Sequence, residues 1–221
     1  MRILVKITAL LTALLLVAAC GPLMQNQSMS SAVQGIGAAA SDLWGETSVD
    51  PRVSLTKDAI DAAPNDLLLF ARVDEEMAST FARVASNGGL NTWVSDAAES
   101  LTLQSGLVVA TRGLGNDLMG MDYSEVAPAL VRGSGSAARI HDYLGGEDQI
   151  VRRSYLCEIT TLRSEVIEII QSRHDTRVVR EACIGSEGSF TNLYWIDTAG
   201  EIWQSRQWIS AGIGAVDIQR L

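Results

Sequence analysis

The segment between residues 190 and 208 holds the side chains best suited to recognise a ligand. Three of the five tryptophans of the chain lie here, beside amide and guanidinium groups. Aromatic rings can stack on the C–H faces of sugars, while neighbouring polar side chains hydrogen bond to sugar hydroxyls. The residues that form this candidate surface for a glycan or a protein partner are Trp195, Trp203, Gln204, Arg206, Gln207 and Trp208.

The spacing within this segment leaves two interpretations open. If residues 202–209 form a strand, alternate side chains point to opposite faces. Trp203 then falls on one face and Trp208 on the other, so one ring is expected to be structural and the other exposed. The alternative is that the rings pack in a core, and that the polar groups line a wet interior or satisfy neighbouring strands.

Motifs for catalysis and for cofactor binding are missing. Gly113-Leu114-Gly115 lacks the third glycine of a dinucleotide fingerprint, and the sequence has no phosphate-binding loop and no G-x-S-x-G elbow. The two histidines, His141 and His174, are each followed by aspartate, but two such pairs do not make a metal site. We therefore expect no catalytic residue, no metal and no cofactor, and we predict that the protein is not an enzyme.

The beginning of the chain has the pattern of an export signal. Arg2 and Lys6 are basic, and an apolar run from residue 7 to residue 17 follows. As a helix, this run would span roughly 16 Å, which is about half of a bilayer core. A basic start, a short apolar run and small residues before a cleavage site are typical of a secretory signal peptide.

A cysteine directly after the small residues makes this signal more specific. Val17-Ala18-Ala19-Cys20 resembles a bacterial lipobox, in which Cys20 is acylated after cleavage. Two or three acyl chains anchor a protein to a membrane almost permanently. With Gly21 rather than aspartate after the cysteine, we predict an outer-membrane anchor in the lipid, facing the periplasm. The alternative is a plain signal peptide in which Cys20 is incidental.

Charge limits the partners of the mature protein. The chain has a formal charge of −9, and removing Arg2 and Lys6 with the signal peptide makes it −11. Such a protein has no electrostatic reason to bind nucleic acid. We expect three parts: a signal peptide at 1–19, the acylated Cys20 with a tether at 20–43, and a single β domain at 44–221.

Two cysteines follow Cys20. In an oxidising compartment, Cys157 and Cys183 are expected to form a disulfide, and the alternative is two buried free thiols. The Cα atoms of a disulfide lie within about 7 Å of each other. Either the strand that carries Cys157 is therefore a direct neighbour of the 177–184 strand, or Cys157 sits at a bend.

The pattern of apolar residues and turns predicts an all-β protein. A short helix is expected from Lys57 to Ala62, with Thr56 as its N-cap, and residues 113–148 are interpreted as a long connection with a weak helical pattern from Tyr123 to Arg132. The fold is predicted to be an antiparallel sandwich or partly closed barrel of about ten strands with one or two short helices. The expected strands are 67–73, 80–85, 90–94 and 101–111, and then 149–160, 163–172, 177–184, 189–197, 200–209 and 214–220.

Two blocks of the sequence resemble a known family. One is Ser105-Gly106-Leu107-Val108-Val109-Ala110-Thr111-Arg112-Gly113-Leu114-Gly115-Asn116-Asp117-Leu118-Met119. The other comprises Arg180-Glu181-Ala182-Cys183, Asn192-Leu193-Tyr194-Trp195-Ile196-Asp197 and Trp203-Gln204-Ser205-Arg206-Gln207-Trp208. With the lipobox, they resemble the YjbF family of group 4 capsule and exopolysaccharide lipoproteins. The usual proline after the last tryptophan is missing at Ser210-Ala211-Gly212.

The resemblance implies an outer-membrane lipoprotein, mostly β in structure, that is encoded with polysaccharide export genes and has no established catalytic residues. We therefore expect a non-enzymatic accessory protein for capsule or exopolysaccharide secretion. Its expected partners are outer-membrane lipid through Cys20, the polysaccharide and other proteins of the export locus. The alternatives are a polysaccharide-modifying enzyme of the same pathway and a structural envelope lipoprotein.

Overall fold

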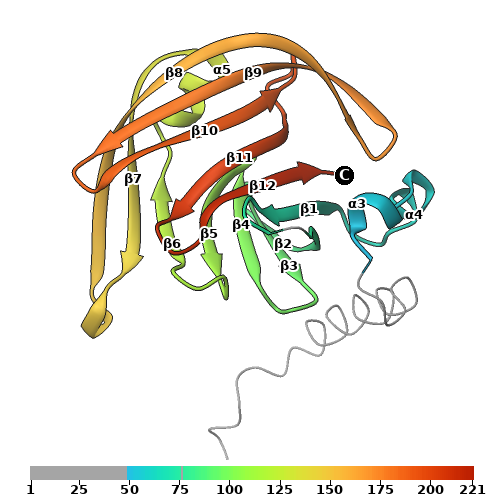
Figure 1. Ribbon diagram of the computed structural model, residues 1–221, viewed down its shortest axis with the longest axis horizontal. Helices are drawn as coiled ribbons and strands as arrows, with labels where there is room; N and C mark the ends of the chain where they lie inside the picture. Colours follow the sequence, from blue (N-terminus) through green and yellow to red (C-terminus); the bar gives the residue numbers. More distant parts are fainter. Residues whose placement is uncertain (1–48, 76) are drawn as a thin grey trace, which may run out of the picture. The chain divides into compact units, whose positions relative to one another are not determined.

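A computed structural model of the chain describes residues 49–75 and 77–221, so the predicted signal peptide and Cys20 lie outside the described residues. The described part is built almost entirely of strands (Figure 1). Its helices are α3 (Pro51–Ser54), α4 (Lys57–Asp61), α5 (Val126–Arg132) and the 3₁₀ turn η1 (Gly146–Asp148). Its strands are β1 (Leu67–Arg72), β2 (Ser79–Asn87), β3 (Leu90–Ser95), β4 (Ser100–Gln104), β5 (Leu107–Arg112), β6 (Leu118–Asp122), β7 (Ser134–Leu144), β8 (Ile150–Ile169), β9 (Ser172–Gly185), β10 (Gly188–Ile196), β11 (Ile202–Ser210) and β12 (Gly214–Arg220).

All twelve strands belong to one antiparallel sheet that is nearly closed into a barrel. Their order is β5-β4-β3-β2-β1-β12-β11-β10-β9-β8-β7-β6, so strands that are consecutive in sequence pair with each other, except β5 and β6. The pairing of β1 with β12 joins the two ends of this meander, and the opening lies between β5 and β6. The all-β, antiparallel prediction is confirmed, with twelve strands where about ten were expected.

Side chains bridge the opening between β5 and β6. Arg112 Nη1 donates to the carbonyl oxygen of Leu118 at 3.1 Å, and the backbone N–H of Leu118 donates to Thr111 Oγ1 at 3.0 Å. From inside the sheet, the Gln207 amide on β11 accepts from the N–H of Val108 at 3.0 Å and donates to the carbonyl oxygen of Gly106 at 2.8 Å. The edge of β5 is therefore partly satisfied without a neighbouring strand.

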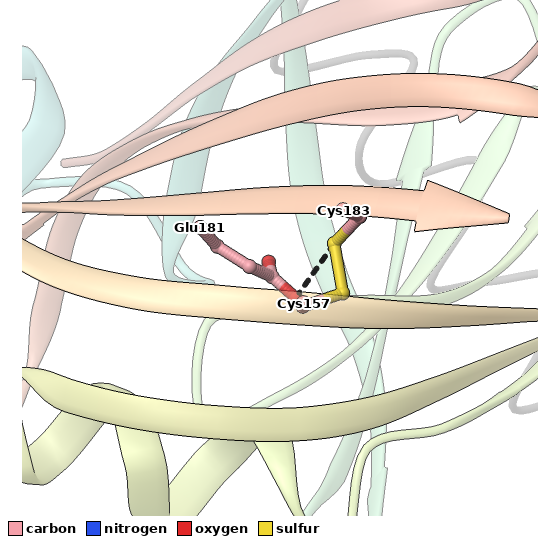
Figure 2. Close-up of side chains that lie close together, drawn as sticks. All are labelled: Cys157, Glu181 and Cys183. Carbon is pink, nitrogen blue, oxygen red and sulfur yellow. Dashed lines mark hydrogen bonds between the residues drawn. A yellow bond between two sulfur atoms is a disulfide. The ribbon is translucent and has the colours of Figure 1, made fainter.

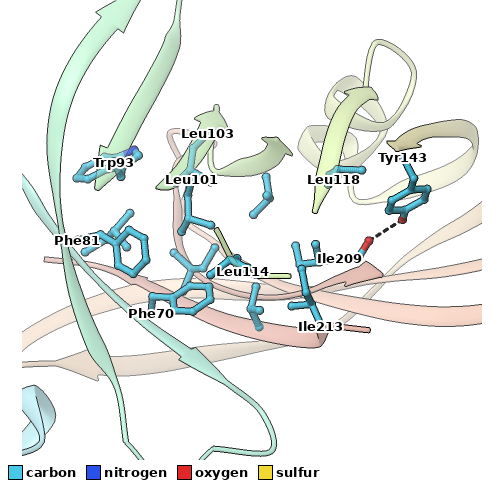
Figure 3. Packing of buried hydrophobic residues seen from close by; sticks show 14 residues of the cluster. Phe70, Phe81, Trp93, Leu101, Leu103, Leu114, Leu118, Tyr143, Ile209 and Ile213 are labelled. Carbon is cyan, nitrogen blue, oxygen red and sulfur yellow. Dashed lines mark hydrogen bonds between the residues drawn. The ribbon is translucent and has the colours of Figure 1, made fainter. Parts of the chain in front are cut away.

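The inward side chains form two apolar clusters. The first joins β1–β6 to β7, β11 and β12, and Figure 3 shows its packing around Phe70 and Phe81, whose rings are 5.0 Å apart. The second contains residues of β5, α5 and β7–β10. Through Val126, Ala129 and Leu130, α5 contributes its apolar face to the second cluster beside the opening.

A glycine sets the end of α5. Gly133 has φ +76° and is the C-cap of the helix, a conformation that favours glycine. A Cβ atom there would collide with the Thr161 side chain on β8. Thr161 Oγ1 instead donates to the carbonyl oxygen of Gly133 at 2.9 Å, which ties the helix end to the sheet.

Several expected elements are confirmed. The helix after the Thr56 cap is α4, and the predicted turn at Asn87-Gly88-Gly89 joins β2 to β3 with positive φ at both glycines. Among the described residues, no helix has the length and apolar character that crossing a membrane requires.

Three predictions about the strands and their connections are wrong. Residues 149–160 and 163–172 form one strand, β8, because the irregularity between Thr161 and Arg163 is a bulge rather than a turn. The hairpin between β8 and β9 turns at Ile170 and Gln171, which have positive φ, and not between the expected strands 163–172 and 177–184. The supposed connection at 113–148 contains β6, α5 and β7.

Candidate functional site

A charged cluster lies inside the sheet, across β7, β9 and β10. Arg139 on β7 and Glu181 on β9 form a two-pronged ion pair, with Nε–Oε1 at 2.8 Å and Nη2–Oε2 at 2.9 Å. Their side chains are 1% and 0% exposed. Two residues of β10 complete the cluster, because Asn192 Nδ2 and the hydroxyl of Tyr194 donate to Glu181 Oε2 at 2.8 and 2.7 Å.

Electrostatics keep Tyr194 protonated and Arg139 charged in this cluster. Burial raises the pKa of Tyr194 well above its usual value, so its hydroxyl stays protonated and donates. For Arg139, burial acts to lower the pKa, but the charge of Glu181 and their hydrogen bonds raise it overall. A buried pair of this kind needs all its hydrogen bonds to offset desolvation, and here Tyr194 and Asn192 supply them.

A second polar chain continues the cluster. The Tyr143 hydroxyl donates to the carbonyl oxygen of Ile209 at 2.6 Å, and His141 Nδ1 lies 2.8 Å from the same hydroxyl (Figure 3 draws the Tyr143–Ile209 bond). His141 Nδ1 therefore carries the proton, and its Nε2 faces Arg139 Nη1 at 3.4 Å. Burial, followed by the charge of Arg139, lowers the pKa of His141 to about 3, so the ring is neutral at neutral pH.

Aromatic rings pack beside this polar chain. Trp208 stacks on Phe190 with centroids 4.7 Å apart, and His141 lies 6.0 Å from the same indole. The backbone N–H of Trp208 donates to the side chain of Asn192 on β10, with Oδ1 at 2.7 Å. The ladder between β10 and β11 ends at the Leu193–Arg206 pair, and the side-chain bond lies beyond that end. The Trp208 ring packs against both apolar clusters.

The disulfide borders the same cluster. Cys157 and Cys183 are direct partners on the neighbouring strands β8 and β9, and their sulfur atoms are joined at 2.04 Å. Of the two topologies that the cysteines allowed, the structure thus has the one with adjacent strands. Figure 2 shows Glu181 next to this bond, with Oε1 3.5 Å from Cys183 Sγ. These three residues have metal-ligating atoms within 4.8 Å of one another, but bonded sulfur atoms offer no thiolate to a metal.

The buried cluster is poorly placed for chemistry on a substrate. Arg139, His141, Glu181 and Tyr194 are almost completely inaccessible to solvent. A substrate would reach them only if strands of the sheet separated. Their mutual bonds satisfy the polar groups of the interior, which is the usual arrangement of buried polar side chains.

An accessible site lies instead at the end of the sheet that carries the β4–β5 and β10–β11 turns. A pocket of about 300 Å³ opens there, which we name the end pocket. Trp203 stands in its wall: His174 stacks on the indole with centroids 3.7 Å apart, and the guanidinium of Arg220 lies 5.3 Å from the ring. The end pocket is lined by Asp66, Leu68, Arg83, Gly89, Asn91, Trp93, Leu103, Ser105, Gly106, Glu201, Ile202, Trp203, Ser205, Ile218 and Arg220.

The β10–β11 turn fixes the Trp203 ring from its other end. Asp197 Oδ2 accepts from Trp203 Nε1 at 2.9 Å, while Oδ1 accepts from the backbone N–H groups of Ala199 and Glu201. Burial acts to raise the pKa of Asp197, but these hydrogen bonds lower it overall. Burial also lowers the pKa of His174. Trp203 is therefore held by a charged carboxylate.

The six residues of the candidate surface do not form one surface. Trp195, Gln204 and Arg206 lie on the outer face, where Gln204 pairs with Gln219 and Arg206 with Asp217. Gln207 is buried, and Trp208 packs inside the sheet. Trp203 alone reaches the end pocket. Both Trp203 and Trp208 are partly buried, so the expectation of one structural and one exposed ring does not describe them.

Most of the residues that line the end pocket were not identified from the sequence. Asp66, Arg83, Asn91 and Trp93 come from β2, β3 and the segment before β1, more than a hundred residues away from Trp203. Only the β1–β12 pairing brings these segments to one end. Trp93 is the one signal available in the sequence, as a tryptophan in the strand after the Asn87-Gly88-Gly89 turn.

A known structure has the same fold as this chain. The chain superimposes on the crystal structure of the hypothetical lipoprotein YmcC from Escherichia coli (K12) with a TM-score of 0.70, at 18% sequence identity. The match covers 86% of this chain and 94% of that chain. No curated protein matches the sequence. Residues 26–221 match the family model described as group 4 capsule polysaccharide lipoprotein gfcB, YjbF, and the chain therefore belongs to the YjbF family of capsule polysaccharide lipoproteins.

Proposed function

We propose that this protein is a lipid-anchored, non-catalytic accessory factor for the secretion or assembly of capsule polysaccharide at the outer membrane, where it binds the glycan or another component of the export machinery. The family match over residues 26–221 carries the proposal. Membership of a lipoprotein family indicates a lipid-anchored place in the cell envelope, and the lipobox at Cys20 supplies the acylation site.

Two features of the structure support a binding role over catalysis. The cluster richest in ionisable side chains, around Arg139 and Glu181, is sealed inside the sheet. The end pocket is open, but its acidic residues Asp66 and Glu201 are each paired with an arginine. Carboxylates that are each held by an arginine are poor general acids and bases, since a catalytic group must be free to exchange a proton with the reacting atoms.

Deletion and complementation test the proposed function. Removing the gene should reduce the polysaccharide on the cell surface, and the wild-type gene should restore it. A Cys20→Ser variant exported through a non-lipoprotein signal peptide should fold but fail to restore it, because the protein is no longer held at the membrane. A Ser28→Ala variant is the matched control in the tether. Unchanged surface polysaccharide after deletion would contradict the proposal.

The enzymatic alternative has a separate test. Purified protein is incubated with the isolated polysaccharide, and the size and linkages of the glycan are measured before and after. We expect no change. Protein-dependent shortening or modification of the glycan would favour an enzyme.

A further inference from the structure

We propose that the end pocket binds an uncharged sugar residue of the polysaccharide, so that the glycan itself is the partner of this protein. This inference rests on the proposed function and assigns its ligand to a defined site. The pocket volume of about 300 Å³ lies at the lower end of the range for small-molecule sites, about 300–1,000 Å³. It therefore suits one sugar ring rather than a folded peptide segment.

An unsatisfied donor in the wall of the pocket points to a ligand. The indole N–H of Trp93 has no hydrogen-bond partner among the described residues, and the residue is only 7% exposed. Buried donors are nearly always paired. Trp93 lines the end pocket, but its indole nitrogen is itself buried, so a small shift of the ring or of the pocket wall must accompany binding before a hydroxyl oxygen of a sugar can accept this bond.

The rim of the pocket carries groups that recognise hydroxyls. Arg83 pairs with Asp66 at 2.8 Å, and Arg220 pairs with Glu201 at 2.6 Å. All four side chains are exposed, and exposed ion pairs are weak, so these groups can exchange a partner for a sugar hydroxyl at little cost. Carboxylates and guanidinium groups both form strong, directed hydrogen bonds.

Charge selects an uncharged sugar. The two arginines and the two carboxylates of the rim cancel, and Asn91 adds a neutral amide. The chain as a whole is acidic, with a formal charge of −9. A uronic acid would meet no surplus of positive charge in the pocket and would be repelled by the protein as a whole.

The remaining wall is apolar and fixed in place. Leu68, Leu103 and Ile218 belong to the first apolar cluster, and Trp203 is held by Asp197 and His174. A site with polar groups on one side and a rigid apolar wall on the other matches a pyranose ring, which has equatorial hydroxyls and apolar C–H faces. Rigid walls lower the entropy cost of binding.

The site has room for more of the glycan. A neighbouring pocket of about 260 Å³ shares Ser105, Glu201 and Ile202 with the end pocket. Gly106 lets the β4–β5 turn approach β11 between them, because its φ is +81° and a Cβ atom would lie 2.7 Å from the Cβ of Ile202. An oligosaccharide can therefore extend from one pocket into the other.

Tryptophan side-chain NMR tests the assignment directly. The full mature chain with Cys20→Ser is labelled with ¹⁵N at the indole nitrogens. It is titrated with glucose, with galactose, with glucuronic acid, and with neutral oligosaccharides from partial hydrolysis of the capsule polysaccharide. We expect saturable shifts of the Trp93 and Trp203 signals with the neutral oligosaccharides, and no shift of the Trp195 signal.

Two matched variants sharpen the test. Trp93→Phe removes the unpartnered N–H and should weaken oligosaccharide binding about tenfold, which corresponds to the loss of one net hydrogen bond. Trp195→Phe removes the other unpartnered tryptophan N–H, on the outer face, and should leave the dissociation constant unchanged. Both variants keep an aromatic ring, and their thermal melting reports whether the fold is intact.

The outcomes separate this inference from the proposed function. The pocket assignment is overturned if no sugar shifts Trp93, if glucuronic acid binds as tightly as the neutral sugars, or if only a protein of the export machinery binds. The proposed function can survive each of those results, because complementation measures it independently. Conversely, sugar binding at Trp93 in a protein whose deletion leaves the capsule unchanged would overturn the proposed function and leave the site in place.

Discussion

Arg139 and Arg220 each bind a glutamate, yet the two pairs have opposite settings. The pair of Arg139 with Glu181 is 1% and 0% exposed and is surrounded by further donors. The pair of Arg220 with Glu201 is 48% and 58% exposed, at the rim of the end pocket. The stability of the fold depends on the pairing of buried charges, because an unpaired buried charge is costly. Exposed charges can change partners at little cost. The comparison separates the groups that hold this sheet together from the groups available to a ligand.

Removing one partner of each pair gives the largest contrast. Glu181→Gln leaves the charge of Arg139 buried without compensation and should lower the free energy of unfolding by about 3–5 kcal/mol. Glu201→Gln should lower it by less than about 1 kcal/mol. Urea denaturation measures both changes. Replacing both residues in Arg139→Met/Glu181→Met should cost less than Glu181→Gln alone, and equal effects of the two single substitutions would refute the distinction.

The disulfide beside Glu181 should give the next largest effect. Cys157 and Cys183 are separated by 26 residues, and closing such a loop stabilises the folded state by about 3.5 kcal/mol in the chain-entropy model. The Cys157→Ala/Cys183→Ala variant should lose most of this stability while the pocket at the other end still binds its ligand. Mass mapping without reductant should find the two peptides joined. Two free thiols in the folded, unreduced protein would show that the bond does not form.

The buried His141 makes stability depend on pH. Its pKa is about 3 in the folded protein and about 6.5 in an unfolded chain. Below pH 6.5 the unfolded chain therefore binds a proton that the folded protein does not. The free energy of unfolding should fall by about 1.5 kcal/mol between pH 6.5 and pH 5, a range in which most carboxylates stay charged.

Substitution of each histidine in turn shows which one causes the pH dependence of the free energy of unfolding. His141→Gln should remove most of the pH dependence in this range. His174→Gln, at the half-buried stacking position on Trp203, should leave most of it. The assignment is wrong if the slope survives in His141→Gln.

Substitutions of two adjacent residues of β11 compare the inner and outer faces of the sheet. They should have the smallest effects on stability. Gln207→Ala leaves backbone groups of Val108 and Gly106 without their side-chain partner and should cost about 1 kcal/mol. Arg206→Ala removes an exposed pair with Asp217 and should cost less. Thermal melting measures the stability of both variants, and a polysaccharide pull-down measures their binding. Loss of binding with Arg206→Ala at constant stability would move the glycan site from the end pocket to the outer face.

The sequence predicted those parts of the fold that depend on local patterns. The glycines after Asn87 specify a turn, and Thr56 specifies a helix start, whatever surrounds them. Strand β7 was missed because its inward positions include Arg139 and His141, so the apolar alternation that marks a half-buried strand is broken. Those residues are tolerated inside only because Glu181 and Tyr143, on β9 and β7, are there to receive them.

The candidate site was predicted in composition but not in arrangement. Tryptophans beside polar groups in β11 were identified, and Trp203 does line the pocket. Alternation alone could not place Trp208, because the ladder with β10 ends at Arg206 and the Asn192 side chain binds the backbone N–H of Trp208 beyond that end. Nor could it bring Trp93 and Arg83 to Trp203, which requires the pairing of the first strand with the last.

That pairing has a consequence for how the protein folds. β1 hydrogen bonds to β12, and the N–H of Leu221 donates to the carbonyl oxygen of Leu67 at 3.1 Å. Contacts between residues so distant in sequence make folding slow, because a long loop must close before they form. A chain that is made from its N-terminus cannot form the β1–β12 pairing until β12 has also been made. Until then β1 and β11 have exposed edges, which is when aggregation and proteolysis threaten this protein most.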